Sequence, residues 1–365
     1  MTNKFKKLTN ASLKTSFFMM GIFLLGSSCT KTDNTPTPAP TPASYSQVNL
    51  VSDTAGFGAN RIDTSLRNAW GIAIGATGTF WIAANHSGST VVYDNNGLQK
   101  LSPVKIPLKS NPTGASPTGV VFNTTAADFV IPGNGKSSFI YSTEDGILSA
   151  WNSSTGGATM TVADRSAANA VYKGLALATD AGANFLYATD FHNGKVDVYD
   201  NNFTLVTTKP FNDPNIPAGF APFNIQNIGG QLYVTYAKQK PDKMDDTAGV
   251  GNGFVDIYTP AGTLVKRFAT QGTLNSPWGI VQAPSGFGQV ANAILVGNFG
   301  DGFINVFDAS GVYQGQLKQG SNAIVIKGLW ALTFDNVAPA DPNLLYFTAG
   351  PNEESHGVFG YLKKN

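Results

Sequence analysis

The chain has 365 residues, of which 42% are hydrophobic and only 13% are charged. Its 40 glycines and 11% aromatic residues argue against a helical bundle or a coiled coil and favour short strands joined by tight turns. Four of the 24 basic residues lie before residue 29, in a segment without acidic residues, so the remaining 20 are outnumbered by 23 acidic residues. Nucleic-acid binding needs a clustered basic surface, and nothing in this sequence supplies one.

Residues 1–28 have the pattern of a secretory signal peptide. A basic stretch from Lys4 to Lys14 precedes an apolar run from Phe17 to Leu25, and small residues then lead to Cys29. The apolar run would span about 13 Å as a helix, which is too short for a bilayer core of about 30 Å. We therefore expect the protein to be exported.

Cys29 is the only cysteine, so no internal disulfide can form. Its position directly after small residues resembles the cleavage site of a bacterial lipoprotein, where the thiol is acylated and becomes the mature N-terminus. The usual site has Leu three residues before the cysteine, whereas this chain has Gly26 there and Leu25 one residue further back. We expect lipidation of Cys29, and simple cleavage and release is the alternative.

Residues 29–44 are predicted to contain the lipid-anchor cysteine and a Pro/Thr-rich linker. Its four prolines from Pro36 to Pro42 alternate with Thr and Ala, which favours extended polyproline II. The linker is expected to be a stalk between the membrane and a folded domain over residues 45–365.

The rest of the chain repeats one hairpin. In its clearest copy, residues 186–200 (LYATDFHNGKVDVYD), a strand is followed by a turn with Gly and by an alternating strand that ends in Tyr-Asp. Gly194 stands in the turn, five residues before Tyr199. The turn needs a positive φ, which Gly adopts without a Cβ clash. The hairpin recurs at residues 80–94, 139–152 and 295–308, and in modified form at 253–258 and 357–361.

A short apolar strand precedes each hairpin and sets the number of units. The equivalent positions in these strands are separated by 48 to 55 residues, and they are Gly71, Gly119, Gly174, Asn224, Gly279 and Ala331. This repeat predicts an all-β fold, a six-bladed β-propeller with four antiparallel strands per blade. A β-sandwich is the alternative, but sandwiches do not repeat at a fixed long period.

The ring is expected to be closed by the N-terminal strand. The sixth hairpin ends at Leu362, which leaves no chain for a fourth strand in that blade. Residues 47–52 (QVNLVS) alternate like a strand and precede the first blade, so they are predicted to be the outer strand of the sixth. This non-covalent clasp would tie the two ends of the domain together.

The repeat motifs resemble those of NHL-type six-bladed propellers. The segments YKGLALAT, LYATDFHNGKVDVYD, APFNIQNIGGQLYVTYAKQ, LVGNFGDG and LYFTAGPNEESHG resemble, more specifically, a family of conserved hypothetical, secreted bacterial propeller proteins. The resemblance runs from Val48 to Leu362. The biochemical role of that family is uncharacterised, so the resemblance implies the fold and export and carries over no catalytic residue.

Chemistry is expected on one face of the ring. In a propeller, the loops between the second and third strands and the starts of the first strands surround the mouth of the central channel, where side chains can converge on a ligand. His86 and His192 share one register in these loops, which Glu144 holds in the second blade. The candidate residues of this face are His86, Glu144, His192, Asp301, Glu353 and His356 in the loops and Trp70, Trp278 and Trp330 in the first strands.

The loop residues have two interpretations. Neutral imidazoles bind divalent metals and carboxylates act as general bases, so a metal or acid–base centre is one interpretation. The other is that hairpin tips favour polar turn residues, which lie one per blade and too far apart to share a metal. No cofactor is clearly implied, and the candidate ligands for zinc or calcium are His86, His192, His356, Asp242, Asp245 and Asp246.

The tryptophans and one long loop also have two interpretations each. Trp70, Trp278 and Trp330 share their position with Phe223, and they could stack on a sugar or another planar ligand or, as we favour, pack between blades. The polar, Gly-rich segment 238–252 interrupts the repeat. It could cover the ligand face as a lid, although a mobile, solvated loop is favoured.

No hydrolase motif of the G-x-S-x-G or H-E-x-x-H type and no Walker loop occurs in the sequence. We therefore expect a cell-envelope lipoprotein whose propeller binds a small molecule, a glycan or an envelope protein, without an assigned catalytic residue. Nucleic acid is not expected as a partner, and the membrane is expected to be contacted only through the N-terminal lipid. The alternative is a metal-dependent lyase or lactonase that uses the channel mouth.

Overall fold

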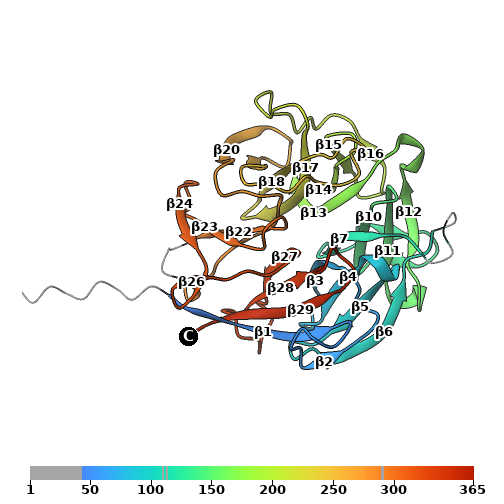
Figure 1. The fold of residues 1–365 in the computed structure, drawn as a ribbon. Coiled ribbons are helices and arrows are strands. Elements are labelled where there is room, and N and C mark those ends of the chain that lie inside the picture. The colour runs from blue at the N-terminus through green and yellow to red at the C-terminus, as the bar shows by residue number, and fades with distance from the viewer. Residues whose placement is uncertain (1–42, 109–110, 112–113, 289–291) are drawn as a thin grey trace, which may run out of the picture. The chain divides into compact units, whose positions relative to one another are not determined.

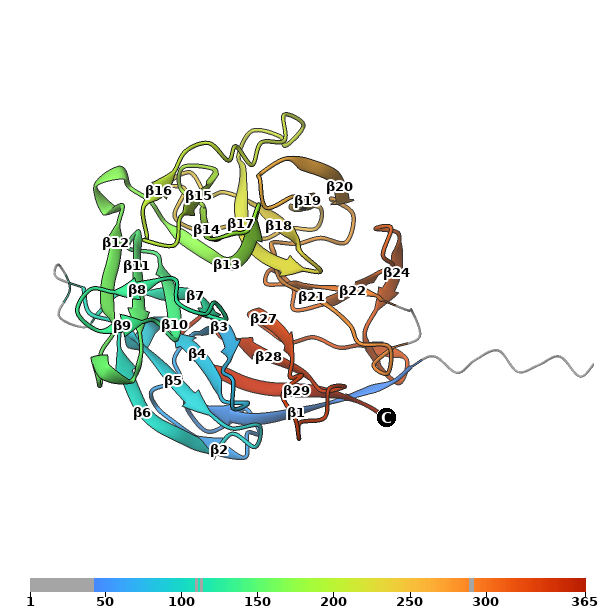
Figure 2. The same ribbon diagram turned by 180° about the vertical axis from the view of Figure 1, so that it is seen from behind.

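Six small antiparallel sheets stand around a common centre (Figure 1; Figure 2). The computed structural model describes residues 43–108, 111, 114–288 and 292–365. The chain divides into the units Met1–Thr41 and Pro42–Asn365, and the predicted signal peptide, Cys29 and most of the linker lie outside the described residues. The second unit confirms the predicted all-β, six-bladed propeller.

The first three blades follow one another along the chain. The first contains β3 (Ala69–Ile74), β4 (Phe80–Ala84), β5 (Ser89–Tyr93) and β6 (Gln99–Lys105). The second contains β7 (Pro117–Phe122), β10 (Phe139–Thr143), β11 (Ile147–Trp151) and β12 (Met160–Asp164), with the side hairpin β8 (Val130–Ile131) and β9 (Gly135–Lys136). The third contains β13 (Tyr172–Asp180), β14 (Ala183–Asp190), β15 (Lys195–Tyr199) and β16 (Leu205–Val206).

The next two blades repeat this order. The fourth contains β17 (Phe220–Ile228), β18 (Gln231–Lys238), β19 (Gly253–Tyr258) and β20 (Leu264–Thr270). The fifth contains β21 (Pro277–Gln282), β22 (Ile294–Asn298), β23 (Ile304–Phe307) and β24 (Tyr313–Gln316), followed by the hairpin β25 (Lys318–Gln319) and β26 (Asn322–Ala323). The helical segments of the described residues are the 3-10 turns η1 (Asn85–Ser87), η2 (Ser153–Thr155) and η3 (Ser166–Ala168).

The sixth blade joins both ends of the domain, as predicted. It contains β27 (Leu329–Phe334), β28 (Leu345–Ala349) and β29 (Val358–Lys364), and the N-terminal strand β1 (Tyr45–Ser52) pairs antiparallel with β29. Figure 1 shows β1 in blue beside β29 in red. The clasp begins at Tyr45, two residues earlier than expected, and the short strand β2 (Arg61–Ile62) adds a parallel fifth strand outside it.

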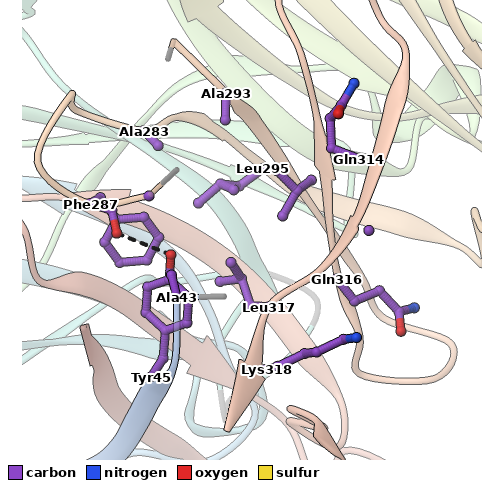
Figure 3. A pocket seen from close by; sticks show the side chains of 13 residues that line it. Ala43, Tyr45, Ala283, Phe287, Ala293, Leu295, Gln314, Gln316, Leu317 and Lys318 are labelled. Atoms are coloured by element: carbon purple, nitrogen blue, oxygen red, sulfur yellow. Dashed lines mark hydrogen bonds between the residues drawn. The ribbon is translucent and has the colours of Figure 1, made fainter. Parts of the chain in front are cut away.

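The clasp strand also reaches the fifth blade. The hydroxyl of Tyr45 donates to the carbonyl oxygen of Phe287 at 3.0 Å, and the two rings pack with centroids 4.8 Å apart (Figure 3). They line a mostly apolar cavity of about 180 Å³ together with Leu295 and Leu317, with Lys318 at its rim. The N-terminal strand therefore contacts two neighbouring blades.

Close approach of the inner strands explains the glycine in the first strand of four of the six repeats, where the other two have Asn224 and Ala331. A Cβ at Gly71 would lie 2.4 Å from the carbonyl oxygen of Thr118, and a Cβ at Gly119 would lie 2.6 Å from the backbone nitrogen of Leu175. Neither position leaves room for a side chain, because the obstacle is the backbone of the next blade. The repeated glycine thus sets how closely the blades converge on the channel.

Candidate functional site

The loops between the second and third strands lie on one face, which we call the upper face. These loops are residues 85–88, 144–146, 191–194, 239–252, 299–303 and 350–357. In every blade the first residue of this loop donates a backbone hydrogen bond to the residue directly before the first strand. For example, Asn85 N donates to Asn68 O at 3.1 Å, and Phe191 N donates to Val171 O at 2.9 Å. The loop residues and the residues before the first strands therefore meet around the ring centre.

Lys173 of β13 lies at this centre and is only 1% exposed. Its ammonium group forms ion pairs with Glu144 from the second blade and, at 3.1 Å, with Asp245 from the fourth. Burial alone would lower the pKa of Lys173, but the charges of the two carboxylates raise it above its ordinary value. Lys173 is therefore a permanent cation held inside the upper face.

Side-chain amides extend this contact to the first and sixth blades. Asn85 Nδ2 donates to Glu144 Oε2 at 2.9 Å, and Asn68 Nδ2 lies 3.4 Å from Asn85 Oδ1. Asn68 Nδ2 also donates to Glu354 Oε2 at 2.7 Å, while Asn68 Oδ1 accepts from Trp330 Nε1 at 2.9 Å. We call the connected residues the polar series, and they are Asp245, Lys173, Glu144, Asn85, Asn68 and Glu354.

Glu354 is held in an uncommon backbone conformation. Asn352, Glu353 and Glu354 have φ values of 54°, 54° and 64°, so three consecutive residues other than Gly occupy the left-handed region. Such conformations cost about 1–2 kcal/mol per residue and tend to be kept at functional sites. Burial, and then the charge of Glu144, raises the pKa of Glu354 to about 7, against the opposing effects of Lys173 and of the hydrogen bond from Asn68.

The predicted tryptophans form a packed cluster in the centre of the ring. Trp70 and Trp330 stack with ring centroids 3.7 Å apart, and Trp278 packs edge-on against Trp330 at 5.9 Å. Their exposed fractions are 1%, 1% and 4%. The structure thus places them as packing residues, together with Phe223, and the polar series lies next to this cluster.

Several buried polar atoms near the cluster have no hydrogen-bond partner among the described residues. They include the indole Nε1 atoms of Trp70 and Trp278, whereas the hydroxyl of Ser276 lies within hydrogen-bonding reach of Asp246. Burial raises the pKa of Asp246, whose side chain lies within the electrostatic reach of Lys173. Since buried polar groups are normally paired, these atoms have unused binding capacity.

The long loop of the fourth blade, residues 239–252, is folded against its neighbours, and we call it the insertion. Gln239 Nε2 donates to Phe191 O of the third blade at 2.6 Å, and Gly249 N donates to Asn275 Oδ1 of the fifth at 2.6 Å. Asp245 reaches Lys173 from the middle of the insertion. These contacts fit the lid interpretation better than that of a mobile, solvated loop.

The three histidines have separate surroundings. His86 on η1 is exposed, but the partly covered ring has a lowered pKa, because desolvation outweighs the charge of Glu144 and a hydrogen bond with the backbone of Glu354. His192 is half-buried, whereas His356 Nδ1 lies 2.9 Å from Asp53 Oδ2, next to the clasp strand. The structure does not bring these three rings together.

The predicted carboxylates also diverge. Asp301 accepts from the amides of Asn275 and Asn298, both at 3.0 Å, and Glu353 is exposed. In the insertion, Asp242 is exposed, whereas Asp245 pairs with Lys173 and Asp246 is buried. Within the described part of the chain, no group of three or more His, Cys, Asp or Glu side chains could hold a metal ion.

Sequence reasoning identified Glu144 and Asp245 but missed the residues that connect them. Lys173 is a charged residue at the start of a largely apolar first strand, and this contrast was the sequence signal that could have identified it. The structural role of Asn68 and Asn85 has no sequence signal, since asparagine is common in turns. In the sixth blade the prediction selected Glu353, whereas Glu354 enters the polar series because of the left-handed turn.

The other end of the channel opens into a cavity of about 370 Å³. Its lining combines apolar side chains, among them Ile72, Val120 and Phe334, with polar groups that include Gln226. The sequence-predicted site residues do not belong to this lining. No helix of the described part is long and apolar enough to cross a membrane.

Two uncharacterized proteins of Acanthamoeba polyphaga mimivirus are similar to this chain over most of their length. The chain is 34% identical to R648 over 316 residues, which covers 83% of this chain and 76% of R648. It is 32% identical to L690 over 336 residues, which covers 87% and 86% of the two chains. No protein-family model matches. These relatives are viral, so they support neither a bacterial origin nor NHL-type repeats.

Solved structures resemble this one in fold. A streptogramin B lyase aligns with a TM-score of 0.53 and 11% identity over 89% of this chain and 98% of that one. A protein of unknown function from Bacteroides thetaiotaomicron aligns with a TM-score of 0.55 and 10% identity over 88% and 76%. At these identities the likeness shows the fold alone.

Proposed function

Because the chain belongs to the family of the uncharacterized mimivirus proteins R648 and L690, which assigns no activity, we propose a function from the upper face itself: the protein binds a small polar ligand at the ring centre. The binding groups are the polar series and the unpartnered atoms of the central cluster. The protein acts as a binding propeller, with the insertion as the cover of its site.

The observation that carries this proposal is that the polar series draws side chains from five blades to one place. Lys173 and its carboxylate partners lie where a purely structural ring needs only apolar packing. Buried ion pairs contribute little to stability, and replacing them with apolar side chains is often neutral or stabilising. Convergent polar groups with shifted pKa values are typical of ligand sites.

We also propose that the protein is exported and is held at a bacterial cell envelope by acyl chains on Cys29. The basic and apolar leader, the small residues before Cys29 and the Pro/Thr-rich linker support this location. Two or more acyl chains anchor a protein stably, because each buried methylene adds about 0.8 kcal/mol.

A lyase or lactonase at the same centre is the second candidate function. Glu354 favours it, because a carboxyl group whose pKa is about 7 can accept a proton at neutral pH. The metal-dependent form would need a set of ligands that the described residues do not group together. Binding therefore remains the leading proposal.

A ligand screen on the full-length protein tests the binding function. The unfolding midpoint is measured with a library of polar small molecules and oligosaccharides, in native protein and in Glu144→Gln. A ligand at 100 times its Kd should stabilise the native protein by about 2.7 kcal/mol, and Glu144→Gln should lose at least half of that gain. Glu353→Gln, an exposed neighbour of the polar series, serves as the control and should keep the gain. Equal stabilisation of all three proteins would place the ligand elsewhere.

A further inference from the structure

Carboxylates outnumber cations around the ring centre. Lys173 is surrounded by Glu144, Asp245, Asp246 and Glu354, each within electrostatic reach. It forms ion pairs with Glu144 and Asp245, and Lys240 lies 3.8 Å from the other oxygen of Asp245. Glu354 and Asp246 form no ion pair with any described residue. Burial raises the pKa of both carboxyl groups, so a cation bound beside them would favour their ionised forms.

The unpartnered atoms add a requirement for hydrogen bonding. Asp246 is 8% exposed, and the hydroxyl of Ser276 lies within hydrogen-bonding reach of its carboxylate. The Nε1 atoms of Trp70 and Trp278 are donors without a partner among the described residues, and the two side chains are 1% and 4% exposed. A ligand that satisfies this centre must offer positive charge to the carboxylates and an oxygen acceptor to the indoles.

The aromatic rings already stabilise a cation. Lys173 Nζ lies 5.1 Å from the centroid of Trp70 and 5.9 Å from that of Phe191. Cation–π attraction of this kind selects organic cations, and tryptophan is the most effective ring. The described residues do not group three or more side chains that could hold a metal ion.

The insertion carries two of these carboxylates, Asp245 and Asp246. Its two ends are held by Gln239 on the third blade and Gly249 on the fifth, and its middle is held at the centre by Asp245. Asp246 also pairs with Gln239 through a backbone bridge. Asp245 is 47% exposed at its side chain and stands next to the buried Asp246. A displacement of the insertion that uncovers Asp246 must therefore also break its bridge to Gln239.

We propose that the ring centre binds a small organic cation with a hydroxyl group, of the amino-alcohol type. Glu354 and Asp246 face its positive charge, and the indole N–H groups of Trp70 and Trp278 donate to its oxygen. The inference rests on the proposed binding function and names the chemical class of its ligand.

Choline and its neutral analogue test this class. Choline carries a permanent charge and one hydroxyl, and 3,3-dimethylbutan-1-ol has the same shape without the charge. Titration calorimetry on the full-length protein should show choline binding at least tenfold more tightly than the neutral alcohol. Tetramethylammonium, which lacks the hydroxyl, should bind more weakly than choline. Glu354→Gln should weaken choline binding at least tenfold, whereas Glu353→Gln should change it less than twofold.

Several outcomes would overturn the proposal. One is no binding of choline, and another is equal affinity for choline and the neutral alcohol. A third is a signal from Ca²⁺ or Zn²⁺ alone that Glu354→Gln abolishes. Unfolding curves of each variant confirm that it is folded. If a neutral or anionic ligand binds in a Glu144-dependent way instead, the ligand class is wrong and the binding function stands; if no ligand depends on Glu144, the binding function itself fails.

Discussion

Lys173 of β13 and Asp245 of the insertion form an ion pair with 3.1 Å between Nζ and Oδ1, which joins the third blade to the fourth across the upper face. Because Lys173 is buried and Asp245 is half-exposed, the pair holds a surface loop to an interior anchor. The charge of Lys173, acting against burial, lowers the pKa of Asp245, so the pair stays ionised at neutral pH.

Breaking this pair should loosen the insertion. Asp245→Asn removes the charge but keeps the size of the side chain, so it should raise amide hydrogen exchange over residues 240–248 while leaving the blades protected. Asp242→Asn, an exposed position of the same loop, should have no such effect. Unchanged exchange in Asp245→Asn would mean that the remaining contacts of the insertion, which include those of Gln239 and Gly249, are enough to hold it.

Glu354 should make the stability of the protein fall as pH rises. Burial raises its pKa from 4.5 to about 7, so between these values the folded protein holds a proton that the unfolded chain has lost. The resulting loss of stability between pH 5 and 8 is at most about 3 kcal/mol. Glu354→Gln should remove it and be more stable than the native protein at pH 8, measured as the free energy of unfolding in denaturant. Glu353→Gln should follow the native protein, and a Glu354→Gln curve parallel to the native one would contradict the assignment.

Gly119 in the first strand of the second blade should be costly to replace. In Gly119→Ala the new Cβ would lie 2.6 Å from the backbone nitrogen of Leu175, so two blades must move apart, at a cost of about 1–3 kcal/mol or more. Gly157→Ala is the matched control, because no atom lies within 4 Å of its Cβ position and its φ is not positive. Thermal unfolding of both variants compares the two sites. Equal midpoints would show that the inner strands can separate freely.

The clasp should carry a large share of the stability. Leu50 is 4% exposed in β1, and Leu50→Ala should cost about 2–5 kcal/mol in the free energy of unfolding. Gln47→Ala, on the exposed side of the same strand, should cost less than about 0.5 kcal/mol. Deletion of residues 47–52 should lead to aggregation or a far lower midpoint, because it exposes the edge of β29. A normal midpoint after that deletion would show that the ring closes without β1.

The envelope location depends on Cys29. Cys29→Ala should release the protein from the membrane fraction or leave it unprocessed, whereas Ser27→Ala keeps a small residue before the cleavage site and should stay anchored. Fractionation of cells followed by detection of the protein separates these outcomes. A Cys29→Ala protein that is processed normally and stays in the membrane fraction would refute lipid anchoring.

The fold could be predicted because its turns and close contacts demand particular residues. Gly88, Gly146, Gly194 and Gly302, which the repeat placed at the hairpin turns, have φ values of 59°, 75°, 65° and 77°. The outer strand of the last blade followed from a simple count of strands. Both signals arise from local geometry that repeats in every unit.

The centre of the site could not be predicted in the same way. Lys173 belongs to an apolar first strand, and nothing in its spacing shows that its ammonium group meets carboxylates from two other blades. Glu353 and Glu354 are equivalent in the sequence, and only a backbone turn of the left-handed kind brings the second one to Asn68. Contacts among loops of different blades depend on the finished ring.

The pairing of β1 with β29 also sets an order of events in folding. The first strand of the domain finds its partner only after the last blade has been made, so contacts of very high sequence separation form late. Until then β1 presents an unpaired edge, which is a template for pairing with other chains. Synthesis at about 5–20 residues per second makes this interval many seconds long, so aggregation should compete with folding most strongly just before the ring is complete.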